Sequence, residues 1–464
     1  MRAPRTRAVP ARLADVLVDA SPRIDVLALP VRPGDAGPGV GDDELEALRL
    51  LGVNLAQVVA LEGVKGKAGE ITRVPWAPGN DAPPVDRVVL VGVGDGEVPA
   101  LRTAAAALAR GLRGRDRLVT TLGGEGGAAA QAVAEALVLA SYTPPRSGVS
   151  EAPKPPVSRV DVVGRPRRGD LAADLLRGTT VAEATVLARD LANTPSTTKG
   201  PSWVAGRARR AAAEVGLTFA VREQRQLRDE GFGGLLAVGS GAQRPPRLVE
   251  VAWNPPQDGR RPAPHVVLVG KGITFDTGGL SLKPREAMVP MKTDMTGAAV
   301  VLAVVRASAR LGLPVRVTAL LALAENSIGA SSYRPGDVVQ QYGGRTVEIR
   351  NTDAEGRIVL ADALAYADAQ LDPDIVVDVA TLTGAATLGL GRGHAALFTP
   401  DDRLAAALDQ AGTASGERVW RLPLSEDYRP ALDSDVADVC HIATVNGVGG
   451  GAIVAALFLR EFTG

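Results

Sequence analysis

The chain has 464 residues, of which 45% are hydrophobic and 22% are charged. This length and composition suit two globular domains and argue against intrinsic disorder. Lysine plus arginine equals aspartate plus glutamate at 52 each, so no overall field draws the protein to nucleic acid, and a dedicated nucleic-acid binder is disfavoured.

The single cysteine and the N-terminal residues bear on the cellular compartment. Because Cys440 is the only cysteine, an internal disulfide is excluded, which fits a reducing compartment and makes the cytoplasm the simplest choice. Residues 1–13 carry four arginines with no apolar stretch after them, which is not the pattern of a secretory signal. No run approaches the ~20 apolar residues of a membrane span, so we expect no membrane association.

Taken in chain order, residues 1–145 are predicted to form a smaller N-terminal α/β domain. Its apolar and alanine-rich runs lie at 25–29, 55–61, 87–93 and 100–112. Prolines then concentrate, and we expect a linker over residues 146–169. A larger domain over residues 170–464 follows, and its first helix is expected to end before Pro195, because a residue that precedes proline is pushed out of the helical region.

The second half of the chain alternates strand-like and helix-like segments. They lie at residues 265–270, 297–311, 315–323, 358–371 and 374–380. Such alternation predicts an α/β sheet with helical crossovers. Ligands of these sheets bind outside the carboxyl ends of the strands, and Lys271 and Thr381 each follow a strand-like run.

The choice of basic residues is unusual. Only seven of the 52 basic residues are lysines, and three of the seven, Lys271, Lys283 and Lys292, fall between positions 271 and 292. A buried lysine can lose its proton and act as a neutral amine, whereas arginine stays charged. The lysines therefore indicate either lysine-specific chemistry or chance clustering.

Four acidic residues fall near predicted strand ends or helix starts: Asp276, Asp294, Asp353 and Glu355. Carboxylates gathered at such places suit divalent cations. We therefore treat the four as candidate metal ligands.

Two of these positions also have a structural explanation. Asp294 precedes a predicted helix and could cap it. The residues from Thr352 to Glu355 match a capping box ahead of the next predicted helix. Taken singly, capping is the commoner explanation for such residues.

Several other kinds of site are excluded by spacing. The glycine-rich run at 270–279 lacks the pattern of a phosphate-binding or dinucleotide-binding loop. HExxH and GxSxG patterns are absent. We leave His265, His394, His441 and Cys440 out of the predicted site.

The segment NTDAEGR at 351–357 resembles the signature of the leucyl aminopeptidases. Further segments resemble the same family in the same order, over about residues 188–462. They are GKGITFDTGGLSLKP at 270–284, MKTDMTGAA at 291–299, AENSIGASSYRPGDV at 324–338, RIVLADALAYA at 357–367 and ATLTGA at 380–385.

The resemblance implies a metal-dependent aminopeptidase that releases leucine or a similar residue from peptides with a free N-terminus, by means of a water activated by two metals. It implies two α/β domains, the larger with a mixed central sheet flanked by helices. Two divalent ions per subunit, manganese or zinc with magnesium or cobalt as alternatives, would be bound by Lys271, Asp276, Asp294, Asp353 and Glu355. Lys271 would bind as a neutral amine, because nearby cations favour loss of its proton.

The resemblance also implies roles within this site. Asp276 and Glu355 would contact both ions, Lys271 and Asp294 one ion, and Asp353 the other. Lys283 would stabilise the developing oxyanion.

Further roles come from the same resemblance. Arg357 would hold a bicarbonate general base at the amino end of a helix. Met291, Thr381 and Gly384 would line the pocket for the first side chain. The family implies a homohexamer, and the chain ends at Gly464, earlier than the family pattern, which implies a short C-terminal end.

Two functions of other classes stay open at this point. One is a non-catalytic or DNA-binding member of the same fold. The other is a two-metal phosphoesterase, because paired ions also catalyse phosphoryl transfer.

Overall fold

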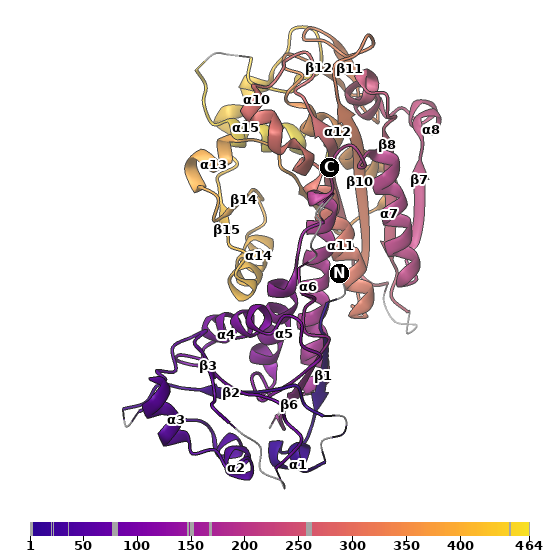
Figure 1. The fold of residues 1–464 in the computed structure, drawn as a ribbon. Helices are drawn as coiled ribbons and strands as arrows, with labels where there is room; N and C mark the ends of the chain where they lie inside the picture. Colours follow the sequence, from indigo (N-terminus) through magenta and orange to yellow (C-terminus); the bar gives the residue numbers. More distant parts are fainter. Residues whose placement is uncertain are drawn as a thin grey trace. The chain divides into compact units, whose positions relative to one another are not determined.

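The computed structural model describes residues 3–19, 21, 23–35, 37–76, 82–145, 148, 153–166, 169–256, 262–444 and 447–463. The chain divides into two compact units, Met1–Val186 and Leu187–Gly464 (Figure 1). This division falls within helix α6 (Leu171–Asn193), later than the predicted linker.

The predicted linker lies only partly within the described residues. Residues 146, 147, 149–152, 167 and 168 lie outside them. The described part includes β6, which belongs to the sheet of the first unit. The proline-rich stretch therefore contributes a strand to that unit.

Six strands form the sheet of the first unit, in the order β1-β6-β5-β2-β4-β3. Neighbouring strands run parallel except at one edge, where β3 is antiparallel to β4. The strands are β1 (Arg5–Val9), β2 (Val26–Val31), β3 (Ile71–Arg73), β4 (Val88–Gly92), β5 (Arg117–Thr120) and β6 (Arg159–Val163).

Helices cover both faces of this sheet, and each face has its own core. Helices α4 (Val98–Gly111) and α5 (Gly127–Ser141) pack with Ala28 and other strand residues. The opposite core contains Leu27 and residues of α1 (Leu13–Val18), α2 (Asp42–Leu50) and α3 (Leu55–Glu62). Because successive strand residues point to opposite faces and both faces are covered, the inner strands β2 and β4 are apolar throughout.

The main sheet of the second unit has five strands in the order β13-β9-β10-β8-β7. The first three run parallel, and β8 is antiparallel to both β10 and β7, which confirms the mixed central sheet. The strands are β7 (Thr218–Arg222), β8 (Arg247–Trp253), β9 (His265–Asp276), β10 (Arg316–Asn326) and β13 (Ile375–Val379).

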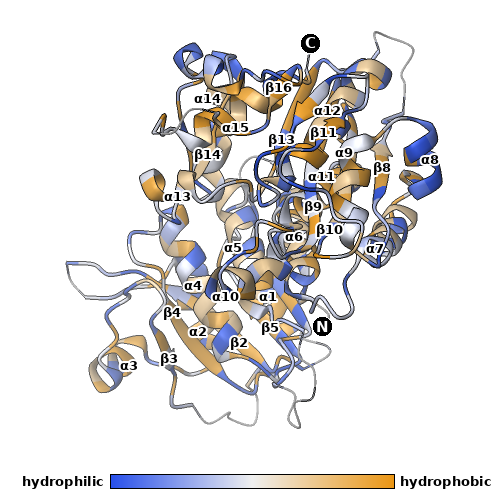
Figure 2. Ribbon diagram, turned by 90° about the horizontal axis from the view of Figure 1, so that it is seen from above, coloured by the Kyte–Doolittle hydropathy of each residue, from blue (hydrophilic) through white to orange (hydrophobic). Residues whose placement is uncertain are grey.

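Two smaller sheets and several helices complete the second unit. The small sheets comprise β11 (Val338–Gln340), β12 (Thr346–Glu348) and β16 (Val439–Cys440), and the pair β14 (Ala395–Leu397) and β15 (Val419–Arg421). The helices are α7 (Pro201–Glu214), α8 (Gln224–Asp229), α9 (Gly233–Val238), η1 (Gly239–Gly241), α10 (Arg285–Met288), η2 (Val289–Thr293), α11 (Thr296–Arg310), α12 (Glu355–Leu371), α13 (Ala385–Leu390), α14 (Asp402–Ser415), η3 (Glu426–Leu432) and α15 (Gly451–Arg460). In Figure 2 the strands β9, β10 and β13 are mostly hydrophobic, whereas α8 is hydrophilic.

Helices α11 and α12 lie on opposite faces of β9. Helix α12 shares the largest core with Val267 and Val269. On the other face, a Cβ built on Gly270 would lie only 2.5 Å from the Cα atom of Ala298 in α11. The chain passes from β9 through α11 to β10, and from β10 through α12 to β13, so the strand order reverses around β9. Such a reversal opens a crevice at the carboxyl ends of the strands.

Strand β9 is longer than the sequence predicted. The predicted strand ends at residue 270, whereas β9 continues to Asp276. Strand β13 stops opposite Gly270, but β10 keeps pairing, with Lys271 opposite Ala322. Lys271 therefore projects from within β9, just beyond the end of its neighbour.

One helical stretch, Arg285–Arg310, is long and apolar enough to cross a membrane, and half of its most apolar window is buried. It consists of α10, η2 and α11, and α11 packs on β9 and β10. Since the buried helix of a globular core passes the same test, we interpret this stretch as part of the core.

Candidate active site and metal centre

The predicted metal ligands lie at the carboxyl end of β9 and in the two segments beside it. Lys271 and Asp276 belong to β9, and Asp294 follows η2. Asp353 precedes α12, and Glu355 is the first residue of that helix. All are buried except Asp353, which is half-buried.

Lys271 links all three segments. Its Nζ lies 2.8 Å from Asp294 Oδ2 and 2.9 Å from Glu355 Oε1, and it donates to the carbonyl of Thr381 at 3.0 Å. Burial alone would lower the pKa of Lys271, but the charges of Glu355 and Asp294 outweigh burial and raise it. Without metal, Lys271 is therefore an ammonium ion held between the carboxyl groups of Asp294 and Glu355.

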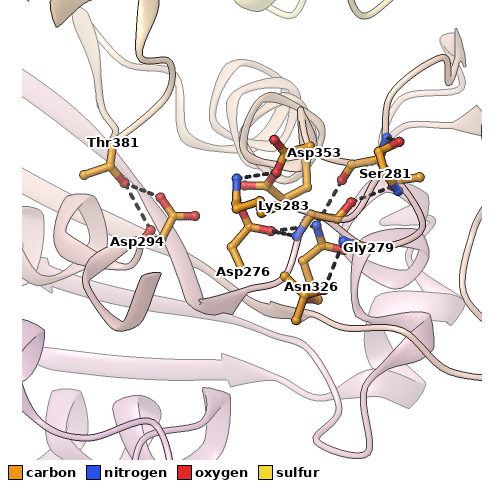
Figure 3. Close-up of polar contacts among 12 residues, drawn as sticks. Asp276, Gly279, Ser281, Lys283, Asp294, Asn326, Asp353 and Thr381 are labelled. Carbon is orange, nitrogen blue, oxygen red and sulfur yellow. Dashed lines mark hydrogen bonds and ion pairs between the residues drawn. The ribbon is translucent and has the colours of Figure 1, made fainter. Parts of the chain in front are cut away.

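Lys283 makes a second bridge of the same kind (Figure 3). Its Nζ lies 2.8 Å from Asp276 Oδ2 and forms an ion pair with Asp353 Oδ1. Burial opposes its charge, but hydrogen bonds and ion pairs with both aspartates raise the pKa of Lys283 to about 12. Lys283 is thus charged at any working pH.

The carboxylates of the cluster are crowded and poorly hydrated. Burial raises the pKa of Glu355 to about 8, and Lys271 only partly opposes this effect. The pKa values of Asp294 and Asp353 are also raised, mainly by burial. Burial therefore disfavours the ionised carboxylates more than the two ammonium groups favour them, and bound cations would lower the pKa of these groups.

The geometry of the oxygen atoms fits metal ions. Asp276, Asp353 and Glu355 each present an oxygen within 4.8 Å of the others. Asp294 Oδ2 and Glu355 Oε1 lie close to Lys271 Nζ, yet neither accepts a well-directed hydrogen bond from any residue that the structure describes. Buried acceptors that lack such bonds are costly, and hard divalent cations prefer oxygen ligands of this type. The donor set thus suits divalent ions.

The capping explanation for these carboxylates is wrong. Helix α11 has Met295 at its N-cap, and α12 has Ala354, and neither helix has a side-chain cap. Because α12 begins at Glu355, three residues earlier than predicted, Glu355 lies inside the helix. Asp294 instead accepts a hydrogen bond from Thr381 Oγ1 at 2.7 Å.

Asn326 and Thr352 hold the loops together, and neither was predicted as a site residue. Asn326 Nδ2 donates to Asp276 Oδ1 at 2.8 Å and to the Thr352 carbonyl at 2.9 Å. The Thr352 hydroxyl donates to the Gly278 carbonyl at 2.7 Å and accepts from the Ser281 amide at 2.8 Å. These bonds fix the loop that carries Asp353 against the loop that carries Lys283.

Arg357 lies in the first turn of α12 and is buried. Its Nη1 donates to the His441 carbonyl at 2.7 Å, whereas its Nε has no partner among the described residues. Burial lowers the pKa of Arg357 to about 10. An incompletely paired guanidinium at a helix amino end is suited to an anion.

His441, which is left out of the predicted site, has a structural position. His441 is fully buried, and its ring nitrogens lie 3.0 Å from the Glu348 carbonyl and 2.8 Å from the Asn351 carbonyl. Burial lowers the pKa of His441 to about 4, so the ring is neutral and supports the segment before Asp353.

The predicted pocket residues occupy two segments beside the cluster. Met291 lies in η2. Thr381 follows β13 and contacts both Lys271 and Asp294. Gly384 is the N-cap residue of α13.

Fold and site together define a metal-dependent hydrolase built on an α/β scaffold. The family model described as "Cytosol aminopeptidase family, catalytic domain" matches residues 186–464, and the model of the N-terminal domain of the same family matches residues 40–146. The chain belongs to the cytosol aminopeptidase family, whose members remove residues from the N-termini of peptides.

Relatives and solved structures agree with this family. A probable cytosol aminopeptidase of Leifsonia xyli subsp. xyli is 45% identical over 443 residues, which cover 95% of this chain and 85% of the relative. The bottromycin maturation enzyme BotP in complex with Mn is 39% identical, with a TM-score of 0.79 over 95% of this chain and 90% of the other. The cytosol aminopeptidase of Coxiella burnetii is 34% identical, with a TM-score of 0.77 over 99% of this chain and 90% of the other.

Proposed function

We propose that the chain binds two divalent ions through Lys271, Asp276, Asp294, Asp353 and Glu355. Asp276 and Glu355 would contact both ions, Lys271 and Asp294 one ion, and Asp353 the other. The close approach of the Asp276, Asp353 and Glu355 oxygens is the observation that carries this proposal. Manganese is the first choice, because BotP was solved in complex with Mn, and zinc, magnesium or cobalt are alternatives.

Metal binding would change the protonation of the site. Lys271 must release a proton before it can bind a cation, and Glu355, with a pKa of about 8, is largely protonated at neutral pH. Metal ligands are bound in their deprotonated form. Cation affinity therefore increases as the pH rises.

The chemistry proposed for the site is attack of water on the first peptide bond. Two bound divalent ions supply Lewis acidity, which lowers the pKa of a water molecule and polarises the scissile carbonyl. Lys283 is charged and half-buried, with its Nζ between Asp276 and Asp353. From that position it donates to the oxyanion that develops on the carbonyl oxygen.

Two further groups complete the proposed site. Arg357, whose Nε has no partner among the described residues, would hold a bicarbonate anion as general base. Met291, Thr381 and Gly384 line the pocket for the first side chain, which is leucine or a similar residue. Met291 belongs to η2, which leads to Asp294, and Thr381 donates a hydrogen bond to the Asp294 carboxylate. Both positions support a pocket beside Asp294.

The assembly and compartment are also proposals. The names of the relatives support a cytoplasmic location. Family resemblance alone supports a homohexamer, and sedimentation of the purified protein tests it. A monomer at micromolar concentration would contradict it.

Metal removal tests the proposed activity. We expect the purified protein with manganese to release leucine from leucyl peptides, to lose this activity on chelation, and to regain it when manganese is returned. N-acetylated peptides of the same sequence are the control and should stay intact. Release of phosphate from model esters with peptides untouched would indicate a phosphoesterase. Tight binding of duplex DNA at physiological salt without peptide cleavage would indicate the DNA-binding alternative.

A substitution at Gly356 tests the placement of Lys271. A Cβ on Gly356 would lie 2.6 to 2.8 Å from Cε, Cδ and Nζ of Lys271. Alanine is favoured over glycine within helices by about 1 kcal/mol, so Gly356→Ala should fold, but it displaces the Lys271 amine. We expect manganese affinity, measured by calorimetry, to fall by about tenfold or more, as for other changes that disturb ligand orientation.

The matched control is Gly206→Ala in α7. A Cβ there meets no atom within 4 Å, so manganese affinity should not change. Unchanged affinity in Gly356→Ala as well would count against Lys271 as a ligand.

A further inference from the structure

Lys199 is fully buried, and its Nζ has no carboxylate partner among the ion pairs of the described residues. The ammonium donates instead to three carbonyl oxygens, those of Leu191 at 3.0 Å, Ala192 at 2.9 Å, and Lys292. All three of its donors are thereby used. Burial of this kind, with Lys292 nearby, lowers the pKa of Lys199 to about 8.

The carbonyls that receive these bonds come from two separate elements. Leu191 and Ala192 lie in the last turn of α6, where helix carbonyls lack intrahelical partners and carry partial negative charge. Lys292 lies in η2, which leads directly to Asp294. Lys199 therefore joins the end of α6 to the segment that carries a proposed metal ligand.

A second lysine strengthens this connection between the end of α6 and η2, which we call the joint, with a hydrogen bond in the opposite direction. Lys292 Nζ donates to the Asn193 carbonyl at 3.1 Å. The loop that carries Lys199 is itself held by Arg244, whose guanidinium donates to the carbonyls of Ser196, Thr197 and Lys199 at 2.8 to 3.0 Å. The joint is thus anchored on both sides.

Lysine suits this position better than arginine does. An ammonium group directs three donors tetrahedrally from a single point, whereas a guanidinium presents a planar fork. In a chain with only seven lysines among 52 basic residues, two of the seven meet at this joint. The retention of lysine in an arginine-rich chain thus extends beyond the proposed metal cluster.

We propose that Lys199 is a positioning residue that fixes the η2 segment and thereby sets Asp294 beside Lys271. This inference rests on the proposed role of Asp294 as a metal ligand. Asp353 and Glu355 are attached to α12 and not to η2. Loss of Lys199 should therefore weaken the metal position that uses Asp294 and spare the position that uses Asp353.

The test is Lys199→Met in the full chain, which keeps side-chain length and removes the donors. We expect manganese titration to show one position weakened by about 10- to 100-fold and the other within about twofold of wild type. The kcat should fall at low manganese and recover as manganese is raised, whereas the circular dichroism of the metal-free protein should stay unchanged. The control is Lys65→Met, at an exposed lysine of the first unit. Its manganese affinity, kcat and circular dichroism should equal those of wild type.

Other outcomes are equally decisive. Equal weakening of both positions, or a loss of kcat that manganese does not restore, would overturn the inference. If Lys199→Met does not fold, Lys292→Met is the test, because it removes the hydrogen bond from η2 to the Asn193 carbonyl. Selective weakening of the manganese position that uses Asp294 would support the inference. Unchanged manganese affinity would overturn it. If wild type neither binds manganese nor cleaves leucyl peptides, the proposed function fails, independently of Lys199.

Discussion

Replacement of Glu355 by glutamine is expected to lower kcat for leucyl peptides by roughly a thousandfold or more. Glu355 is 1% exposed, and its Oε1 lies 2.9 Å from Lys271 Nζ. Glutamine keeps the shape but puts an amide N–H₂ group where an anionic oxygen would face the proposed cations. Bound metals contribute several kcal/mol to catalysis, and about 1.4 kcal/mol corresponds to a factor of ten. The measurement is kcat together with the number of manganese ions bound per chain.

Asp362→Asn is the matched control for this change, because Asp362 is a second buried carboxylate on α12. It accepts hydrogen bonds from the amides of Leu235 at 2.7 Å and Tyr342 at 2.9 Å, and burial raises its pKa to about 7. We expect Asp362→Asn to lower the melting temperature while the folded enzyme keeps its metal content and turnover. Near-normal turnover in Glu355→Gln would refute the proposed metal site.

The order of strands and helices could be read from the sequence, but their ends could not. The apolar runs and alternating segments predicted an α/β fold with helical crossovers. The end of β9 was misplaced by six residues, because Lys271 and Asp276 are polar and yet pair with β10. A polar residue is retained in a strand when its partners come from other segments, and a local pattern carries no information about those partners.

The candidate site shows the same division between local and long-range information. Whether Thr352 or Ala354 precedes α12 depends on backbone angles, so a capping box and a metal site were indistinguishable from sequence alone. The family signature favoured the metal site, and the absence of side-chain caps on α11 and α12 excludes the capping box, so the metal site is the prediction that stays. Asn326 was missed because its two acceptors, Asp276 and Thr352, lie 50 and 26 residues away.

Lysine usage was the one compositional signal that pointed toward the site before any motif was considered. The structure places Lys271 and Lys283 between pairs of carboxylates, where each ammonium offsets charge at a position suited to a cation. The two lysines differ in their surroundings and in their proposed roles. Lys271 is itself buried between two buried carboxylates and is proposed to become a ligand, whereas Lys283 lies at the more open end beside Asp353 and is proposed to stay charged.

Replacement of Lys283 by methionine is accordingly expected to lower kcat by about 100- to 1000-fold, the usual effect of losing one oxyanion donor. The metal content should stay at the wild-type value, because none of the proposed ligands is removed. The KM should change far less than kcat, since an oxyanion exists only in the transition state and in the intermediate. The measurement combines steady-state kinetics with manganese titration.

The metal content decides between the two roles that the geometry allows for Lys283. Its ion pairs with Asp276 and Asp353 could serve only to hold those carboxylates in place. In that case Lys283→Met would lose manganese, and excess manganese would restore kcat. A low kcat at full manganese occupancy would instead show that the charge of Lys283 stabilises the reacting group. Lys283→Arg separates charge from geometry, because it keeps the cation but replaces a compact ammonium by a planar fork, and only partial recovery of kcat is expected.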